Sequence, residues 1–515
     1  MGISLYRSFL LAGFLITLSL SSSEAGTKRV VIVVLDQMRP DFINNYDLTH
    51  LRGLRRDSVD FVNASVGHFP AITPVSHAVI GTGLFPKRFG WGDEIFRDAE
   101  GLVGEKGSWH SSYELSLPQY RRFFKKFTPR PGALSLLKRK LKGTAIAVGQ
   151  KSYATILLGG RDADRVITLE RVKEGEWKGW CVPSGLRVPT YISKPEGGRF
   201  YLHCSGDYGT KKTLYPLDGD HYVPGDDPGH QGGDVWTADA ALEVMRREKN
   251  WRVLLITMGG IDKIGHIYGE MDGHKPKNPS FRLSGILKVA DQQVGKIIAE
   301  LKRQNQWEET LFIVTADHGG LSAAKNFYGD PRELKFIYGQ LSKKDHREMP
   351  QAAQKWFQRE IVDHGIADTA IRIWLTEEAE KDSESQCRSF SKMPGAIAVY
   401  KKQEVVQDAG YQLCSVFRGE KVPDFLSPVP ILNTMVQKDS PDLVIQLEDD
   451  TGYRLLGDHG GLQEKVMRIP MLVHGLDRPA KASQCPIRLV DLMPVVMRSI
   501  GVDPPSWLDG NVNCL

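Results

Sequence analysis

The chain has 515 residues, more than the roughly 250 to 300 that a single hydrophobic core organises, so we expect one elaborated domain or two. Its 41% hydrophobic and 25% charged residues exclude a largely disordered or low-complexity protein. The 67 basic and 62 acidic residues give a formal net charge of only +5 without a basic stripe, which indicates no nucleic-acid-binding patch.

The first 25 residues have the pattern of a secretory signal peptide. Arg7 precedes an apolar stretch from Phe9 to Leu20, and small residues after it end at Ala25 in an A-x-A-like cleavage site. A membrane anchor is the alternative, but a spanning helix needs roughly 20 apolar residues and this stretch is shorter. We therefore expect residues 1–25 to be removed and the protein to be exported to a periplasmic or extracellular space, with no membrane-spanning segment after cleavage.

Four short apolar runs rich in β-branched residues predict strands that are buried on both faces. In chain order they are Val30 to Leu35, Val253 to Thr257, Leu311 to Val314 and Met471 to Val473. Helical patterns occur at Thr237 to Glu248, Leu283 to Arg303 and Leu489 to Ile500. This alternation predicts an α/β fold with a mostly parallel central sheet.

Two regions interrupt the alternation. Residues 100–235 are rich in glycine, proline, tryptophan and lysine, and residues 325–450 have a mixed pattern. We interpret both as insertions that cap one catalytic domain of residues 26–515.

Six cysteines occur in the chain, and none belongs to a C-x-x-C motif, which disfavours a thiolate zinc site. They are Cys181, Cys204, Cys387, Cys414, Cys485 and Cys514. In an oxidising compartment they could pair as sequence neighbours into three disulfides, one of 15 pairings that six cysteines allow. Free buried thiols are the alternative.

Acidic and imidazole side chains follow the predicted strands, at the edge where parallel strands end and ligands usually bind. They are Asp36 after the first strand, Asp262 and His266 after the second, Asp317 and His318 after the third, and His459 in the turn-rich segment Gly457 to Gly461. Because the first three groups follow parallel strands, we expect these side chains to meet at one edge of the sheet.

The spacing of these residues indicates metal ligands. Asp262 and His266 are four residues apart and share one face if their segment is helical, so one ion could bind both. Asp317 and His318 are adjacent and could share an ion only if the chain turns there, and the glycine pair that follows would supply the turn. Carboxylate and imidazole ligands without thiolate favour zinc, while manganese or iron would accept a similar set.

Thr73 lies directly before Pro74 and the apolar run Ala78 to Ile80. Threonine before proline is a good helix start, with Thr73 as N-cap and Pro74 at the first helical position, and capping alone is the simplest interpretation. A helix amino terminus also favours anions, so the same geometry would place the hydroxyl beside a phosphate. His77, one turn further along, is expected to support this helix.

Together these motifs resemble the alkaline phosphatase superfamily, specifically its type I phosphodiesterase/nucleotide pyrophosphatase branch and the threonine-nucleophile alkaline phosphatases close to it. The matching pieces occur in the family's order: Leu35 to Asp41, Thr73-x-x-x-His77 with Thr82-Gly83, Asp262-x-x-x-His266, Thr315 to Gly319 and His459-Gly460. The resemblance implies an alkaline-phosphatase-like three-layer sandwich with helices on both faces of the sheet.

The resemblance also implies a site with two zinc ions. One would be held by Asp36, Thr73, Asp317 and His318, and the other by Asp262, His266 and His459. Thr73 would be the nucleophile and form a covalent phosphothreonine, while the second ion would stabilise the departing oxygen and then activate water.

Two positions depart from the family pattern. Ungapped counting places Glu94 where relatives have an asparagine that donates to a phosphate oxygen, and an ionised carboxylate cannot donate and would repel phosphate. A different alignment, binding of another cation by Glu94, or altered activity are the open interpretations. Monoester-specific relatives carry Lys-x-Arg, where this chain has Lys151 and Tyr153.

Lys151 keeps the family's lysine and is a candidate catalytic residue, with a solvated loop lysine as the alternative. Glu94 and Tyr153, where the chain departs from the pattern, are candidate substrate-binding residues. Loss of the arginine should weaken binding of a dianionic monoester more than that of a monoanionic diester.

The sequence therefore predicts a metal-dependent hydrolase of phosphodiester or pyrophosphate bonds that acts through a threonine intermediate. Its substrate would be a small phosphorylated molecule, with a nucleotide as one candidate. A phosphomonoesterase with the same two-metal site is the first alternative, and a catalytically inactive ligand-binding homologue is the second. A sulfatase is disfavoured because the segment around Thr73 lacks the Cys/Ser-x-Pro-x-Arg motif.

Overall fold

The computed structural model describes residues 27–174, 177–182, 185–192, 201–203, 229–268, 283–321, 326–327, 355–403, 410–416, 427–455 and 457–515. The expected signal peptide, residues 1–25, lies outside these ranges. None of the helices in these ranges combines the length and the apolar character that are needed to cross a bilayer.

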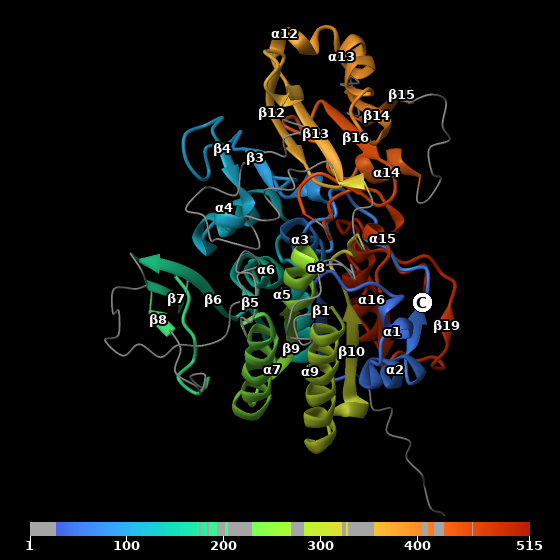
Figure 1. The fold of residues 1–515 in the computed structure, drawn as a ribbon. Coiled ribbons are helices and arrows are strands. Elements are labelled where there is room, and N and C mark those ends of the chain that lie inside the picture. The colour runs from blue at the N-terminus through green and yellow to red at the C-terminus, as the bar shows by residue number, and fades with distance from the viewer. Residues whose placement is uncertain are drawn as a thin grey trace, which may run out of the picture.

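A ten-stranded sheet runs through the middle of the described part of the chain (Figure 1). Its strands, in spatial order, are β19 (Ala482–Ser483), β2 (Val59–Phe61), β18 (Met471–His474), β10 (Thr310–Thr315), β1 (Arg29–Leu35), β9 (Trp251–Met258), β5 (Thr144–Lys151), β6 (Arg165–Glu174), β7 (Trp177–Val182) and β8 (Tyr201–His203). The run from β10 to β6 is parallel, whereas β18 is antiparallel to β10. All four strands predicted from apolar runs are present, and their burial explains why their sequences are almost entirely hydrophobic.

Two groups of helices cover this sheet. In one, α9 (Leu283–Arg303) contacts α2 (Thr49–Arg56), α7 (Gly229–Arg247) and α8 (Gly260–Tyr268), and α7 packs on β9 and β5. In the other, α3 (Thr73–Thr82) contacts α5 (Ala133–Leu141), α6 (Ser152–Gly159) and α16 (Leu492–Ser499), and α6 packs on β5 and β6. The prediction of a three-layer α/β arrangement is therefore confirmed.

The predicted helices are present, with shifts at their ends. α9 spans the predicted residues, and its buried Ile286, Ala290 and Val294 recur every four residues. α7 begins at Gly229, before its predicted start at Thr237. The earlier start was not predicted because the glycines of the first turns carry no hydrophobic periodicity. The last helix is divided into a 3-10 turn, Leu489–Asp491, and α16.

A separate five-stranded sheet lies away from α7 and α9, at the top of Figure 1. Its spatial order is β12 (Val362–Ala367), β13 (Ala370–Leu375), β16 (Leu443–Leu447), β14 (Ala396–Gln403) and β15 (Gly410–Val416), with antiparallel pairing throughout. Buried side chains of this sheet and of α13 (Ser383–Phe390) form a second hydrophobic core. These strands fall within residues 325–450, which we interpret as an insertion.

The remaining elements are α1 (Phe42–Asn45), β3 (Ile95–Arg97), β4 (Trp109–Ser111), α4 (Leu117–Phe127), β11 (Asn326–Phe327), α12 (Glu377–Glu380), α14 (Pro428–Leu432), β17 (Thr451–Gly452) and α15 (Glu464–Met467). β3 and β4 form a hairpin, and β11 pairs with β17. β3 begins directly after Glu94, and the backbone N–H of Ser112, directly after β4, donates to the carbonyl oxygen of Glu94 at 2.7 Å, so this hairpin positions one of the candidate site residues.

Two of the three expected disulfides are confirmed. Cys387 on α13 is bonded to Cys414 on β15, and Cys485 is bonded to Cys514 near the carboxyl terminus. The expected partner of Cys181, Cys204, lies outside the described residues.

Candidate active site

The predicted metal ligands converge because their strands are neighbours. β1 is parallel to both β9 and β10, so the carboxyl ends of all three strands reach the same edge of the sheet. Asp36 directly follows β1, Asp317 follows β10, and Asp262 lies on α8, just after β9. His459 reaches this edge from a loop that pairs with the segment just before Thr73 through a bridge between Ala71 and Gly460.

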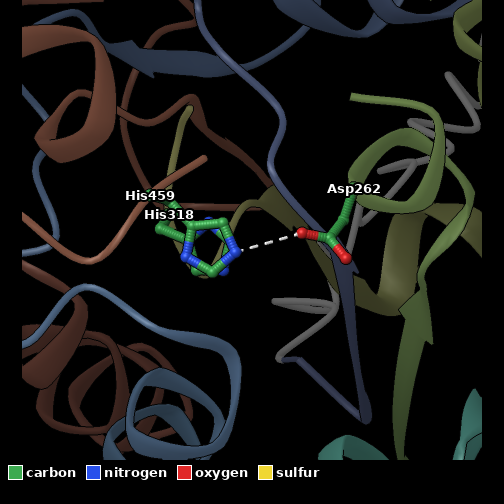
Figure 2. A group of neighbouring side chains, drawn as sticks. All are labelled: Asp262, His318 and His459. Carbon is green, nitrogen blue, oxygen red and sulfur yellow. Dashed lines mark ion pairs between the residues drawn. The ribbon is translucent and has the colours of Figure 1, made fainter. Parts of the chain in front are cut away.

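At this edge there are three groups of side chains, and within each group the potential ligand atoms lie within 4.8 Å of one another. The groups are Asp36 with Asp317 and His318, Asp262 with His318 and His459, and His266 with Asp458 and His459. Figure 2 shows the middle group, in which the rings of His318 and His459 overlap and both face Asp262. All of these side chains are buried.

Around Asp317 and His318 the chain leaves β10 and bends, as the pairing of the two residues requires. The backbone N–H of His318 donates to Asp317 Oδ1 at 2.9 Å, and His318 Nε2 lies 3.3 Å from Asp317 Oδ2 and 3.6 Å from Asp36 Oδ1. The glycines that follow are needed for space, because a Cβ on Gly319 would lie 2.0 Å from the carbonyl oxygen of Lys465.

The second ligand group forms as its spacing predicts. α8 places Asp262 and His266 one turn apart, with His266 Nε2 3.1 Å from Asp262 Oδ1. His459 Nε2 lies 3.3 Å from the same oxygen and 3.2 Å from His266 Nε2. Three potential ligand atoms therefore surround one point.

Thr73 differs from its prediction in one respect. It is the first residue of α3 rather than the N-cap, which is Ile72. The capping bond that a Thr73 N-cap would make, in which its hydroxyl oxygen accepts from a backbone N–H, is therefore absent among the described contacts. Thr73 Oγ1 instead lies 3.2 Å from His318 Nε2. His77 supports the helix as expected, since its Nδ1 lies 2.8 Å from the Thr73 carbonyl oxygen and its Nε2 2.8 Å from Thr257 Oγ1.

Lys151 is buried at the end of β5, so its interpretation as a solvated loop lysine is wrong. Its Nζ donates to Asp36 Oδ2 at 2.6 Å and to Asp262 Oδ2 at 2.5 Å, one carboxylate from each proposed metal site. Burial lowers the pKa of Lys151, but the carboxylates of Asp262 and Asp36 outweigh this effect and raise the pKa well above its usual value. The ammonium therefore remains charged.

The donor set fits divalent cations. Asp36 Oδ1 and Asp317 Oδ2 are buried and accept no hydrogen bond from the residues that the structure describes. Burial, reinforced by the neighbouring carboxylates, raises the pKa of Asp36 well above its usual value and that of Asp317 to about 7. Burial lowers the pKa of His318 and of His459. Neutral imidazoles beside carboxylate oxygens without donors are the environment that zinc and similar cations bind.

Glu94 forms an ion pair with a cation of the chain itself. Both of its carboxylate oxygens accept from Arg454 Nη1, at 3.2 and 3.0 Å, and Arg454 Nη2 donates to Asp458 Oδ1 at 3.2 Å. Asp458 Oδ1 in turn lies 3.8 Å from Nδ1 of His266. Neither Arg454 nor Asp458 is predicted as a site residue by its sequence pattern, although Asp458 directly precedes His459 in the segment Gly457 to Gly461.

Tyr153 lies in the first turn of α6, and its ring packs at 89° on that of Tyr113, with 4.8 Å between the ring centroids. Burial and the carboxylates of Asp36 and Asp262 raise the pKa of Tyr153, although Lys151 opposes them. Its hydroxyl therefore remains a neutral donor and cannot replace the charge of a guanidinium.

A second buried ionic cluster connects the smaller sheet to this region. Arg372 on β13 donates to both carboxylate oxygens of Asp368, at 3.1 and 2.7 Å, and its Nε lies 2.8 Å from Asp93 Oδ2. Asp93 Oδ1 accepts from the backbone N–H of Glu94 at 2.6 Å. Asp368 packs so closely on Gly460 that a Cβ there would lie 2.5 Å from its carboxylate.

Comparisons with known proteins agree with this geometry. Residues 30–463 match the family described as type I phosphodiesterase / nucleotide pyrophosphatase. The fold is similar to that of wild-type alkaline phosphatase PafA, with a TM-score of 0.61 and 15% identity over 95% of this chain and 98% of that chain. It is also similar to that of murine ectonucleotide pyrophosphatase / phosphodiesterase 5, with a TM-score of 0.56 and 15% identity over 93% of this chain and 96% of that chain.

An inactive form of the murine protein in complex with AMP is similar too, with a TM-score of 0.54 and 15% identity over 93% of this chain and 96% of that chain. Among curated proteins, the bis(5'-adenosyl)-triphosphatase enpp4 of Xenopus laevis is 40% identical over 58 residues, which is 11% of each chain. The match thus spans about a ninth of that relative. These likenesses confirm the predicted alkaline-phosphatase-like fold.

Proposed function

Because the chain belongs to the type I phosphodiesterase / nucleotide pyrophosphatase family, we propose that it hydrolyses phosphodiester or pyrophosphate bonds through a covalent threonine intermediate at a two-metal centre. The observation that carries the proposal is the position of Thr73 Oγ1, 3.2 Å from His318 Nε2. That imidazole lies against the buried carboxylates of Asp36 and Asp317, each of which keeps one oxygen without a hydrogen bond among the described residues. A hydroxyl that only capped its helix would not face the ligand cluster.

In this proposal Asp36, Thr73, Asp317 and His318 hold one zinc ion, and Asp262, His266 and His459 hold the other. Manganese or iron would accept the same ligands. The cations supply Lewis acidity at the attacking and departing oxygens. The short distances within each set of ligands support this assignment. His318 also has a ring nitrogen within 4.8 Å of ligand atoms of Asp262 and His459, so the two sets are adjacent.

The chain's own residues perform the remaining steps. The Thr73 oxygen attacks phosphorus in line, and its bond to phosphorus forms while the bond to the leaving oxygen breaks. Water then attacks the same phosphorus, breaks its bond to the threonine oxygen and releases a phosphate monoester that keeps the second ester group, which is a nucleoside monophosphate if the substrate is a nucleotide. The amino end of α3 favours the negative charge of the phosphoryl group. Lys151 fixes Asp36 and Asp262 relative to each other and adds positive charge beside them.

The substrate we propose is a small phosphorylated molecule, with a nucleotide as the first candidate. The complex of the similar murine protein with AMP supports this choice. The replacement of a guanidinium by the neutral hydroxyl of Tyr153 supports a diester rather than a monoester. Export to a periplasmic or extracellular space is supported by the pattern of residues 1–25 and by the two disulfides.

The proposal is tested by comparing kcat/KM for a p-nitrophenyl methyl diester with that for p-nitrophenyl phosphate, using zinc-loaded protein. We expect the diester to be the better substrate, and trapping with labelled substrate to mark Thr73. A preference for the monoester would favour the phosphomonoesterase alternative. Zinc binding with no phosphothreonine on any substrate would favour an inactive ligand-binding homologue.

A further inference from the structure

Further contacts hold both partners of the ion pair between Glu94 and Arg454. The backbone carbonyl of Glu94 accepts from Ser112 N–H at 2.7 Å, and its backbone N–H donates to Asp93, which Arg372 holds. The Arg454 guanidinium is occupied by carboxylates at both terminal nitrogens. The backbone of Glu94 is therefore fixed on both sides, and its carboxylate and that of Asp458 both hold the Arg454 guanidinium.

This pair lies beside the proposed metal centre. Arg454 donates to Asp458, which adjoins His459 in the chain and faces His266. Tyr113 lies next to this pair, because it directly follows Ser112, whose backbone N–H donates to the carbonyl oxygen of Glu94. Tyr113 also packs on Tyr153, so Glu94, Arg454 and the two tyrosines belong to one wall near the ligands.

The charges in this wall do not favour a highly charged substrate. Glu94 and Asp458 contribute two negative charges and Arg454 one positive charge, so the three side chains together are net negative when ionised. A guanidinium that is already bonded to carboxylates has lost most of its attraction for a further anion. A phosphate monoester brings one more negative charge than a diester and is repelled more strongly.

We propose that Glu94 is a specificity-determining residue, which neutralises Arg454 and thereby selects monoanionic phosphate diesters against dianionic monoesters. The inference rests on the proposed function and names the feature that sets its substrate class. Arg454 is then a latent phosphate-binding cation, and Asp458 is a positioning residue that holds it in place.

The test replaces the carboxylate with its neutral isostere in zinc-loaded, full-length mature protein. Glu94→Gln keeps the shape but frees the guanidinium, so the ratio of monoester to diester kcat/KM should rise at least about tenfold. The double variant Glu94→Gln with Arg454→Met should lose this gain. Glu384→Gln is the matched control and should leave the ratio unchanged. It removes an exposed carboxylate of α13 that is paired with Lys401 on β14.

Competition by inorganic phosphate gives a readout that does not depend on turnover of the monoester. Glu94→Gln should bind phosphate about tenfold more tightly than the wild-type protein, and the double variant should not. An unchanged ratio and unchanged phosphate binding in Glu94→Gln would overturn this inference alone, provided the wild-type protein cleaves the diester. If the wild-type protein cleaves neither substrate, the proposed function itself fails.

Discussion

Two clusters of buried charge lie close together in this protein and differ in how they are neutralised. In the ligand cluster, Asp36 and Asp262 share one ammonium, that of Lys151. Asp36 and Asp317 each keep one oxygen without a hydrogen bond among the described residues. In the other, Asp93 and Asp368 enclose the guanidinium of Arg372, which bonds both oxygens of Asp368. Buried aspartate alone therefore does not identify a metal site. The ligand cluster differs in that its carboxylates lie together with the imidazoles of His266, His318 and His459, which are the ligand types that zinc and similar cations bind.

The largest expected effect is the loss of activity when the Thr73 hydroxyl is removed from the ligand cluster. Thr73→Ala removes the proposed nucleophile and should lower diester kcat/KM at least about a thousandfold. The zinc content, measured by atomic emission, should fall less than the activity because the other ligands remain. Thr73→Ser is the control, since it keeps a hydroxyl and should retain measurable activity and phosphoenzyme. Full activity in Thr73→Ala would remove the threonine from the mechanism.

The next effect concerns the stability of the cluster around Arg372. Arg372→Met leaves Asp93 and Asp368 buried without their partner and should lower the free energy of unfolding by about 3 to 5 kcal/mol. Urea titrations followed by circular dichroism measure this change. Arg388→Met removes an exposed arginine of α13 and should change stability by less than about 0.5 kcal/mol. Equal stability of both variants would show that the cluster does not hold the smaller sheet to the site.

An aspartate-to-asparagine substitution should change the stability in opposite directions in the two clusters. Asp317→Asn removes a repelled carboxylate and should stabilise the chelator-treated protein by about 1 kcal/mol while it reduces zinc binding. Asp368→Asn breaks a bidentate pair and should destabilise the protein. Thermal unfolding of both variants in EDTA tests this contrast, and destabilisation by Asp317→Asn in EDTA would mean that its carboxylate is already compensated.

The smallest effect is the pH dependence of that difference. The pKa of Asp317 is raised to about 7 in the folded protein by burial, against its ordinary 3.8. A raised folded pKa contributes stability that is present below the unfolded pKa and is lost as pH rises through the folded pKa. In EDTA, the stability advantage of Asp317→Asn over the wild-type protein should therefore grow between about pH 4 and pH 7. A constant difference across this range would contradict the raised pKa.

The ligand cluster was predictable from sequence because its signals are local. Asp36 and Asp317 follow apolar strands directly, and Asp262 and His266 carry a helical spacing, so the parallel sheet brings them together without further information. Arg454 and Glu94 are 360 residues apart and come from segments without periodicity, so nothing in the sequence pairs them.

The position of Thr73 was predicted only in part. The Thr-Pro sequence located the start of α3 but not the residue at which the helix begins, since the extended conformation of Ile72 is set by tertiary contacts of its segment. That difference of one residue decides whether the hydroxyl caps the helix or faces the ligands.

The central claim, a pair of cations around an activated hydroxyl, is tested most directly by a crystal structure of the protein grown with zinc and vanadate. Anomalous scattering should locate one zinc among Asp36, Asp317 and His318 and a second among Asp262, His266 and His459, with vanadium bound to Thr73 Oγ1. Zinc located elsewhere, or a threonine hydroxyl remote from both ions, would contradict the account.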